Sequence, residues 1–180
     1  WTYIFTKFGC NRIVIHKTVI HKIKKAYKKN NYLLLKKVID LKSFKIDFNF
    51  DTMHALHAKY NTLEFYNKNM LHLGQLRNLQ EIPLFKTYLD YIATPLKDIF
   101  TGIVLDFFYS TIGVVGPSHI DREHVIILGI KNATYYHLNN TDVIVEPGDI
   151  LYIPKGVLHH SFSSRERIIL SLSLWEKARL

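Results

Sequence analysis

The chain has 180 residues, of which 48% are hydrophobic and 22% are charged, and its formal net charge is +9. This length favours one domain with its own hydrophobic core, and the composition excludes an intrinsically disordered chain. The single cysteine, Cys10, excludes an internal disulfide and is typical of a reducing, cytoplasmic compartment. Since no apolar run approaches the ~20 residues of a membrane span, and residues 1–12 do not resemble a signal peptide, we expect no membrane association.

The positive charge is concentrated at the start of the chain. Residues 1–50 contain 12 Lys and Arg against 2 Asp and Glu, a net of +10, whereas residues 51–180 contain 12 against 13, a net of −1. The basic segment predicts a helix over about 12–38, because four apolar residues recur at every fourth position: Ile15, Val19, Ile23 and Tyr27. We interpret it as a solvated amphipathic helix packed on the core. The alternative is a helix that docks on nucleic acid or on an acidic partner.

The patterns that follow predict one strand and then several helices. Residues 43–50 alternate between apolar and polar side chains, which is typical of a short, half-buried strand. Residues 51–100 have a mostly helical pattern, in which Asp51 is suited to cap one helix and Pro83 fits the first turn of another.

The second half of the chain has a different pattern, in which short strands alternate with turns rich in Gly, Pro and Asn. Such spacing predicts an antiparallel sandwich or small barrel. The expected strands are Ile103–Tyr109, His124–Ile130, Thr134–Leu138, Asp142–Glu146, Asp149–Ile153 and Arg167–Leu174. We therefore expect an α+β protein of one domain, with a mainly helical part at 1–100 packed on a β-barrel at 101–180 that also recruits the early strand.

Three polar residues of the β half have the spacing of a metal site. His119 and Asp121 are two residues apart, so in an extended segment their side chains point to the same side. His159 follows 38 residues after Asp121, enough chain to cross a sheet and return opposite this pair. Two His and one carboxylate are the facial triad of non-haem Fe(II) oxygenases. His160 directly follows His159 and would point to the opposite face, so we expect only His159 to bind metal.

The sequence around His159 carries a longer motif. Residues 147–159 read Pro-Gly-Asp-Ile-Leu-Tyr-Ile-Pro-Lys-Gly-Val-Leu-His. Together with the His-x-Asp pair, this stretch resembles the JmjC-type, cupin-like oxygenases, which include ribosomal-protein and asparaginyl hydroxylases; with flanking strands, the resemblance covers about residues 103–175. It implies a double-stranded β-helix in which His119, Asp121 and His159 bind Fe(II), with 2-oxoglutarate as co-substrate and O2 as oxidant.

The residue that would anchor the distal carboxylate of 2-oxoglutarate is not fixed by this motif. In the family a Lys or Arg commonly lies 13 residues after the Asp, but here that position is Thr134. Lys131 lies close to this position, whereas Arg167 begins the last strand, on the same face as Ser171. Arg167 is our first choice, because it also resembles the prolyl-hydroxylase-like arrangement of an Arg with a Tyr. By spacing, that tyrosine is either Tyr109 or Tyr135, although both also suit barrel packing.

The resemblance implies an enzyme that couples oxidative decarboxylation of 2-oxoglutarate to hydroxylation of a C–H bond. A protein side chain is the first expected substrate, and a free amino acid or another small molecule is the second. The alternative function is a non-oxygenase cupin that binds a metal or ligand without turnover. Nucleic acid is a less favoured partner, acting through the basic N-terminal segment. The sequence does not determine the oligomeric state.

Overall fold

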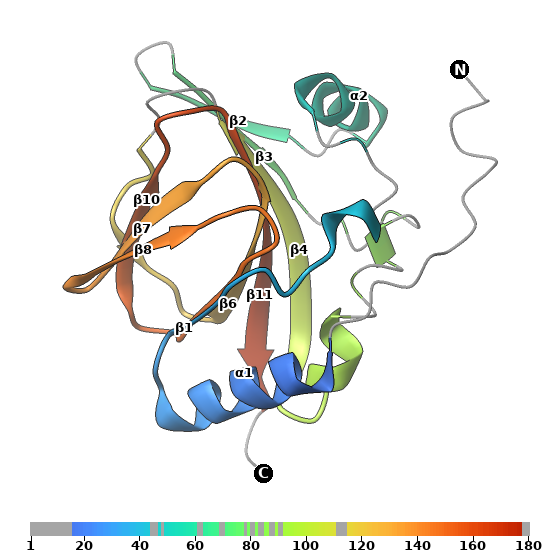
Figure 1. Ribbon diagram of the computed structural model, residues 1–180. Helices are drawn as coiled ribbons and strands as arrows, with labels where there is room; N and C mark the ends of the chain where they lie inside the picture. The colour runs from blue at the N-terminus through green and yellow to red at the C-terminus, as the bar shows by residue number, and fades with distance from the viewer. Residues whose placement is uncertain are drawn as a thin grey trace.

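The computed structural model describes residues 16–43, 47, 49–60, 63–68, 71–77, 79, 82, 85–86, 89, 92–110 and 115–177. The described strands form two antiparallel sheets that face each other (Figure 1). The larger sheet has the order β1 (Leu33–Leu35), β9 (Ile150–Ile153), β6 (His124–Lys131), β11 (Arg167–Glu176), β4 (Phe100–Ser110), β3 (Leu71–Leu76) and β2 (Leu63–Lys68). The smaller sheet has the order β5 (His119–Ile120), β10 (Leu158–Phe162), β7 (Thr134–Leu138) and β8 (Thr141–Val145).

The central strands of the larger sheet are buried on both faces, and this explains why they are almost continuously apolar. In β6, Ile126 and Leu128 belong to the core on the helical side, whereas Val125 and Ile127 belong to a second core between the sheets. The smaller sheet contributes Tyr136, among others, to this second core. The alternation therefore gives the barrel an interior lined from both sheets, into which a polar site can be built.

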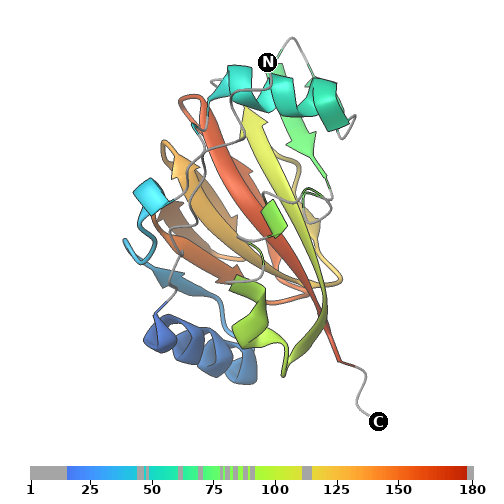
Figure 2. The ribbon, with the colours of Figure 1, turned by 90° about the vertical axis from the view of Figure 1, so that its right-hand side faces the viewer.

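Helix α1 (Lys17–Lys29) packs at one end of the larger sheet, and α2 (Phe50–Tyr60) lies at the other end (Figure 2). Two short 3₁₀ helices, η2 (Leu41–Ser43) and η4 (Thr94–Leu96), lie in the connections. The C-cap Asn30 of α1 adopts a left-handed conformation and ends the helix. None of the described helices is long and apolar enough to cross a membrane.

The α+β cupin fold predicted from the sequence is confirmed, but several predicted elements differ. The basic helix ends at Lys29, and residues 33–35, expected to be helical, form the edge strand β1 because they pair with β9. Residues 12–15 of that prediction lie outside the described residues. The expected strand at 43–50 is wrong at its described ends, since Ser43 ends η2 and Phe50 begins α2; residues 44–46 and 48 are not described.

The prediction of mostly helical structure over 51–100 is also wrong in part. Helix α2 is present, but the next residues form the hairpin of β2 and β3, and β3 pairs with β4. Segments as short as β2 and β3 have sequence patterns that fit either a helix or a strand. Pairing of β3 with β4 favours the strand conformation. Both parts of the predicted division, residues 1–100 and 101–180, therefore contribute strands to the same sheet.

Candidate metal centre

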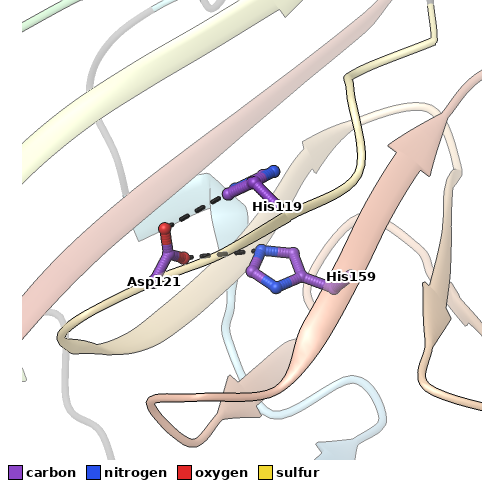
Figure 3. A group of neighbouring side chains, drawn as sticks. All are labelled: His119, Asp121 and His159. Carbon is purple, nitrogen blue, oxygen red and sulfur yellow. Dashed lines mark ion pairs between the residues drawn. The ribbon is translucent and has the colours of Figure 1, made fainter.

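The three predicted metal ligands lie together at the start of the smaller sheet. His119 on β5 is paired with His159 on β10, and Asp121 follows β5 directly. Asp121 Oδ1 lies 3.6 Å from His119 Nε2, and Asp121 Oδ2 lies 3.4 Å from His159 Nε2 (Figure 3). One ligand atom from each residue lies within 4.8 Å of the other two. The structure thus brings together two imidazoles and a carboxylate in the arrangement expected from the sequence.

Backbone carbonyl groups orient both imidazole rings. His119 Nδ1 donates to the carbonyl oxygen of Pro117 at 2.8 Å, and His159 Nδ1 donates to that of Val157 at 3.0 Å. Because Nδ1 carries the proton in each ring, the lone pair of Nε2 is left for a metal. The two rings are already fixed in the tautomer and direction that metal binding needs.

The ligands have unequal exposure. The side chain of His119 is 49% exposed, whereas that of His159 is only 6% exposed. Burial lowers the pKa of His159, the proximity of His119 lowers it further, and the carboxylate of Asp121 acts in the opposite direction. A lowered pKa keeps His159 neutral, as a metal ligand must be. His159 therefore forms the buried side of the site, whereas His119 forms the side that is open to solvent.

Three protein ligands on one side of a metal leave the other coordination positions for small molecules. This donor set, two imidazoles and one carboxylate, is the one used by non-haem Fe(II) oxygenases. The loop before His159 supports the geometry, because Gly156 donates its backbone N–H to the carbonyl oxygen of Asp121 at 3.0 Å. Gly156 has φ of +82°, a conformation that suits glycine best.

Arg167 lies in the barrel interior with part of its guanidinium unpaired. The residue is 2% exposed; its Nε donates to Ser110 Oγ at 3.0 Å and its Nη2 donates to Ser161 Oγ at 3.1 Å. Nη1 is also buried and has no hydrogen-bond partner among the described residues. Burial lowers the pKa of Arg167. A buried guanidinium with an unsatisfied donor is costly and fits a ligand that brings a carboxylate.

Tyr136 is a candidate site residue that the sequence patterns did not single out. It is 3% exposed, and burial raises its pKa to about 12, while Arg167 and a hydrogen bond with Ser161 act in the opposite direction. The charge of Asp121 acts on its hydroxyl in the same direction as burial. The sequence offered one signal for Tyr136. Alternate residues of a strand share a face, so Tyr136 lies on the same face as Thr134, the position at which the family commonly has its Lys or Arg.

The remaining predicted anchor residues divide into two groups. Thr134 and Ser171 are buried, and Thr134 Oγ1 has no hydrogen-bond partner among the described residues. Tyr109 is also buried, but it belongs to the core on the helical side of the larger sheet and not to the barrel interior, so the prediction for this tyrosine is wrong. Lys131 and Tyr135, in contrast, have partners away from the barrel interior. Lys131 Nζ forms an ion pair with Glu166 Oε1 at 2.6 Å, and the ring of Tyr135 stacks on Phe162 with centroids 4.8 Å apart.

Tyr135 therefore does not occupy the place expected for it. In β7 the buried positions are 134, 136 and 138, whereas 135 and 137 are half-buried and belong to the opposite face. The spacing from Asp121 placed the tyrosine one residue too early, and a shift of one residue reverses the face of a strand. His160 follows the same rule: its Nδ1 lies 3.3 Å from Ser118 Oγ, and its ring packs near that of His137.

The fold and this group of side chains agree with the resemblance to JmjC-type, cupin-like proteins found in the sequence. Residues 130–178 match the family model of the JmjC domain. The structure is similar to YcfD, a ribosomal oxygenase from Escherichia coli, solved in complex with cobalt and 2-oxoglutarate, with a TM-score of 0.68 and 14% identity. The similar region covers 94% of this chain and 53% of that chain.

Two further structures of YcfD from Escherichia coli give the same result. The complex with cobalt and succinic acid has a TM-score of 0.68, 14% identity and coverage of 94% of this chain and 53% of that chain. Another has a TM-score of 0.61, 16% identity and coverage of 83% and 49%. This chain thus spans about half the length of these solved proteins. No curated protein sequence matches the chain.

Proposed function

We propose that this protein is an Fe(II)- and 2-oxoglutarate-dependent oxygenase that hydroxylates a C–H bond. The observation that carries the proposal is the presence, in one barrel, of the His119, Asp121 and His159 group and the unpaired Nη1 of Arg167. Ser161, which accepts from Arg167, lies two residues after His159 on β10, so both side chains point to the same side of that strand. A ligand that chelates the metal and ends in a carboxylate would use both features.

2-Oxoglutarate has this chemistry, and we assign its distal carboxylate to Arg167. The guanidinium would donate from Nη1, and the hydroxyl groups of Tyr136 and Thr134 offer further donors from β7. Lys131 is a weaker choice because Glu166 already neutralises it. Ser171 remains a proposed neighbour of the co-substrate, whereas Tyr135 and Tyr109 do not, because Tyr109 packs in the core on the helical side of the larger sheet.

The residues of the chain position the reactants and limit solvent access. His119, Asp121 and His159 would hold Fe(II), which together with 2-oxoglutarate activates O2 for insertion of oxygen into a C–H bond. The Nδ1 contacts with Pro117 and Val157 keep both imidazoles in place during turnover. The apolar interior around Ile127, Tyr136 and Leu151 keeps water from the buried side.

The substrate we favour is a protein side chain, and the alternative is a small amino-acid-like molecule. The exposure of His119 supports a site that opens at the surface, where a bulky substrate reaches it without entering the barrel completely. The likeness to YcfD, a ribosomal oxygenase, also favours a protein substrate. With a single cysteine, the chain suits work in the reducing cytoplasm.

The test is spectroscopic. Fe(II) and 2-oxoglutarate added to the protein without oxygen should produce a visible charge-transfer band, and admission of O2 should produce succinate. Replacing Asp121 with Ala should abolish both signals. The matched control is His160→Ala, which removes a neighbouring imidazole from the other face of β10 and should preserve both.

The result that would overturn the oxygenase proposal is a folded protein that binds Fe(II) but gives neither the band nor succinate. Such a protein would belong to the alternative function, a cupin that binds a metal or ligand without turnover. Loss of the band in both Asp121→Ala and His160→Ala would instead contradict our assignment of the ligands.

A further inference from the structure

The outer face of α1 is a cluster of unpaired positive charges. Five of the six lysines of this 13-residue helix are exposed and have no acidic partner among the described residues: Lys17, Lys22, Lys25, Lys28 and Lys29. The sixth, Lys24, forms an ion pair with Asp98 at 2.7 Å. The helix contains no acidic residue. We call the five residues the lysine face, and we propose that it binds the phosphate backbone of a nucleic acid.

The lysine face is held in a fixed direction by the rest of the molecule. The opposite side of α1 buries Val19, Ile20, Ile23 and Ala26, each less than 9% exposed. At the C-terminal half of the helix, Tyr27 donates from its hydroxyl to Glu176 Oε1 at 2.9 Å. The lysines thus stand on a rigid element, which lowers the entropy cost of binding an extended anion.

The lack of acidic partners on α1 contrasts with several lysines in other parts of the described structure. Several lysines elsewhere are neutralised: Lys36 pairs with Asp149, Lys131 with Glu166, and Lys155 with Glu176. On α1, in contrast, Lys25 lies four residues before Lys29, and a like-charge pair at that spacing destabilises a helix by roughly 0.2–0.5 kcal/mol. The fold compensates for this repulsion by burial of the other face.

The composition of the face favours nucleic acid over the two other kinds of anionic partner. Protein–protein interfaces are depleted in lysine and have an apolar centre, which the lysine face lacks. A helix that binds an anionic membrane inserts its apolar side, but that side of α1 is buried in the core. Phosphate contacts, in contrast, need only cations at intervals along a line.

The geometry supplies such a line. From Lys17 to Lys29 the helix rises by about 18 Å, at ~1.5 Å per residue. Lysine is a point charge on a flexible stem and gives positioning without sequence specificity. We therefore expect binding that depends on salt and not on base sequence. This inference does not depend on the proposed oxygenase activity.

The experiment measures binding of the full chain to a fluorescent DNA duplex of random sequence, from 50 to 300 mM KCl at pH 8. Five phosphate contacts predict a slope of log K against log salt of about −4.5. The triple variant Lys25→Gln, Lys28→Gln, Lys29→Gln should reduce the slope by about 3 and weaken binding by about two orders of magnitude at 0.1 M salt. Glutamine retains helix propensity, so the helix should persist.

The matched control is Lys42→Gln, Lys59→Gln, Lys86→Gln, which removes the same charge from exposed lysines outside α1. It should bind within about twofold of the unmodified chain. Equal loss in both triple variants would overturn the proposal, because net charge would then explain binding. Tighter binding to phosphatidylserine vesicles or to polyglutamate than to the duplex would overturn it in favour of a membrane or an acidic protein. Circular dichroism and Co(II) binding verify that both variants are folded.

Discussion

Nη2 of Arg167 donates to the hydroxyl of Ser161 at 3.1 Å, and this contact joins the two sheets of the barrel. Arg167 begins β11 in the larger sheet, whereas Ser161 lies on β10 in the smaller one, two residues from His159. The two serines fix the guanidinium, and its buried Nη1 has no hydrogen-bond partner among the described residues. This arrangement makes Arg167 the centre of the first prediction.

Replacement of Arg167 with Gln should weaken 2-oxoglutarate binding to the Co(II)-loaded protein. Loss of one partner of a buried charged contact costs about 2–5 kcal/mol, equivalent to roughly 30-fold to several-thousand-fold in affinity. Calorimetry measures this loss, and thermal unfolding verifies the fold. Lys131→Gln should leave the affinity unchanged, and pyruvate, which lacks the distal carboxylate, should bind equally to all three proteins. Unchanged 2-oxoglutarate binding by Arg167→Gln would disprove the assignment.

Tyr136 and Tyr135 give a matched pair from one strand. Tyr136→Phe should weaken 2-oxoglutarate binding by about 5- to 10-fold, because a hydrogen bond contributes about 1–1.5 kcal/mol net. Tyr135→Phe should have no effect, since its ring stacks on Phe162 on the other face of β7. The same calorimetric titration compares the two variants. If Tyr135→Phe were the weaker binder, the face of β7 assigned to the interior would be incorrect.

His159 and His160 form a second matched pair, for metal binding alone. His159→Gln should reduce Co(II) affinity by at least about 100-fold, since even residues that only orient ligands contribute 10–100-fold. His160→Gln should bind Co(II) like the unmodified chain, because its imidazole contacts Ser118 on the opposite face. The visible absorption of Co(II), titrated without 2-oxoglutarate, measures both constants. Comparable losses in the two variants would contradict the predicted site.

Asp149, the acid of the Pro-Gly-Asp motif, should be a structural residue. Its buried carboxylate accepts from Lys36 Nζ and from the backbone N–H groups of Lys37 and Glu146, each at 2.8 Å. Burial raises its pKa, but these hydrogen bonds are stronger and hold the pKa below its usual value. Asp149→Ala leaves buried donors unpaired and should reduce the free energy of unfolding by about 3 kcal/mol.

Urea unfolding measures this effect, and Glu146→Gln is the control. Glu146 also pairs with Lys36 but is exposed, so its replacement should cost less than about 1 kcal/mol. Equal effects of the two substitutions would show that burial of Asp149 does not determine its contribution.

Glu176 should make stability depend on pH in the acidic range. The hydrogen bond from Lys155 is the main cause that lowers its pKa to about 2, with Tyr27 and His124 as further contributors and burial acting in the opposite direction. A carboxyl with a lowered pKa in the folded state stabilises the fold above its unfolded pKa, near 4.5. This contribution is lost as pH falls from about 4.5 towards 2.

Glu176→Gln should therefore be less stable than the unmodified chain at pH 7, by about 1 kcal/mol once solvent screening is included. The difference in the free energy of unfolding should decrease between pH 4.5 and 3, because Glu176 of the unmodified chain binds a proton in the unfolded state over this range. Urea unfolding at fixed pH values provides the comparison. A difference that stays constant from pH 7 to 3 would show that the charge of Glu176 is not responsible.

The sequence by itself determined the candidate metal ligands and the class of fold. His119 and Asp121 share a side because alternate residues of an extended chain do so, and the motif that ends at His159 fixes the third ligand. Strand pairing then needs only to align His159 with His119, as it does. The buried face of α1 was also readable, since Val19 and Ile23 recur with the period of a helix and both are buried.

Only the tertiary structure decided which groups complete the site. Tyr136 replaces Tyr135 because the register of β7 with β10 fixes which face is interior. Lys131 is neutralised by Glu166, which lies 35 residues later in the chain. Arg167 donates to two serines, but its Nη1 has no partner among the described residues. Likewise, residues 71–76 became a strand through pairing with β4, and residues 63–68 became a strand through pairing with β3. These contacts join residues that are far apart in the chain, so the periodicity of neighbouring residues cannot predict them.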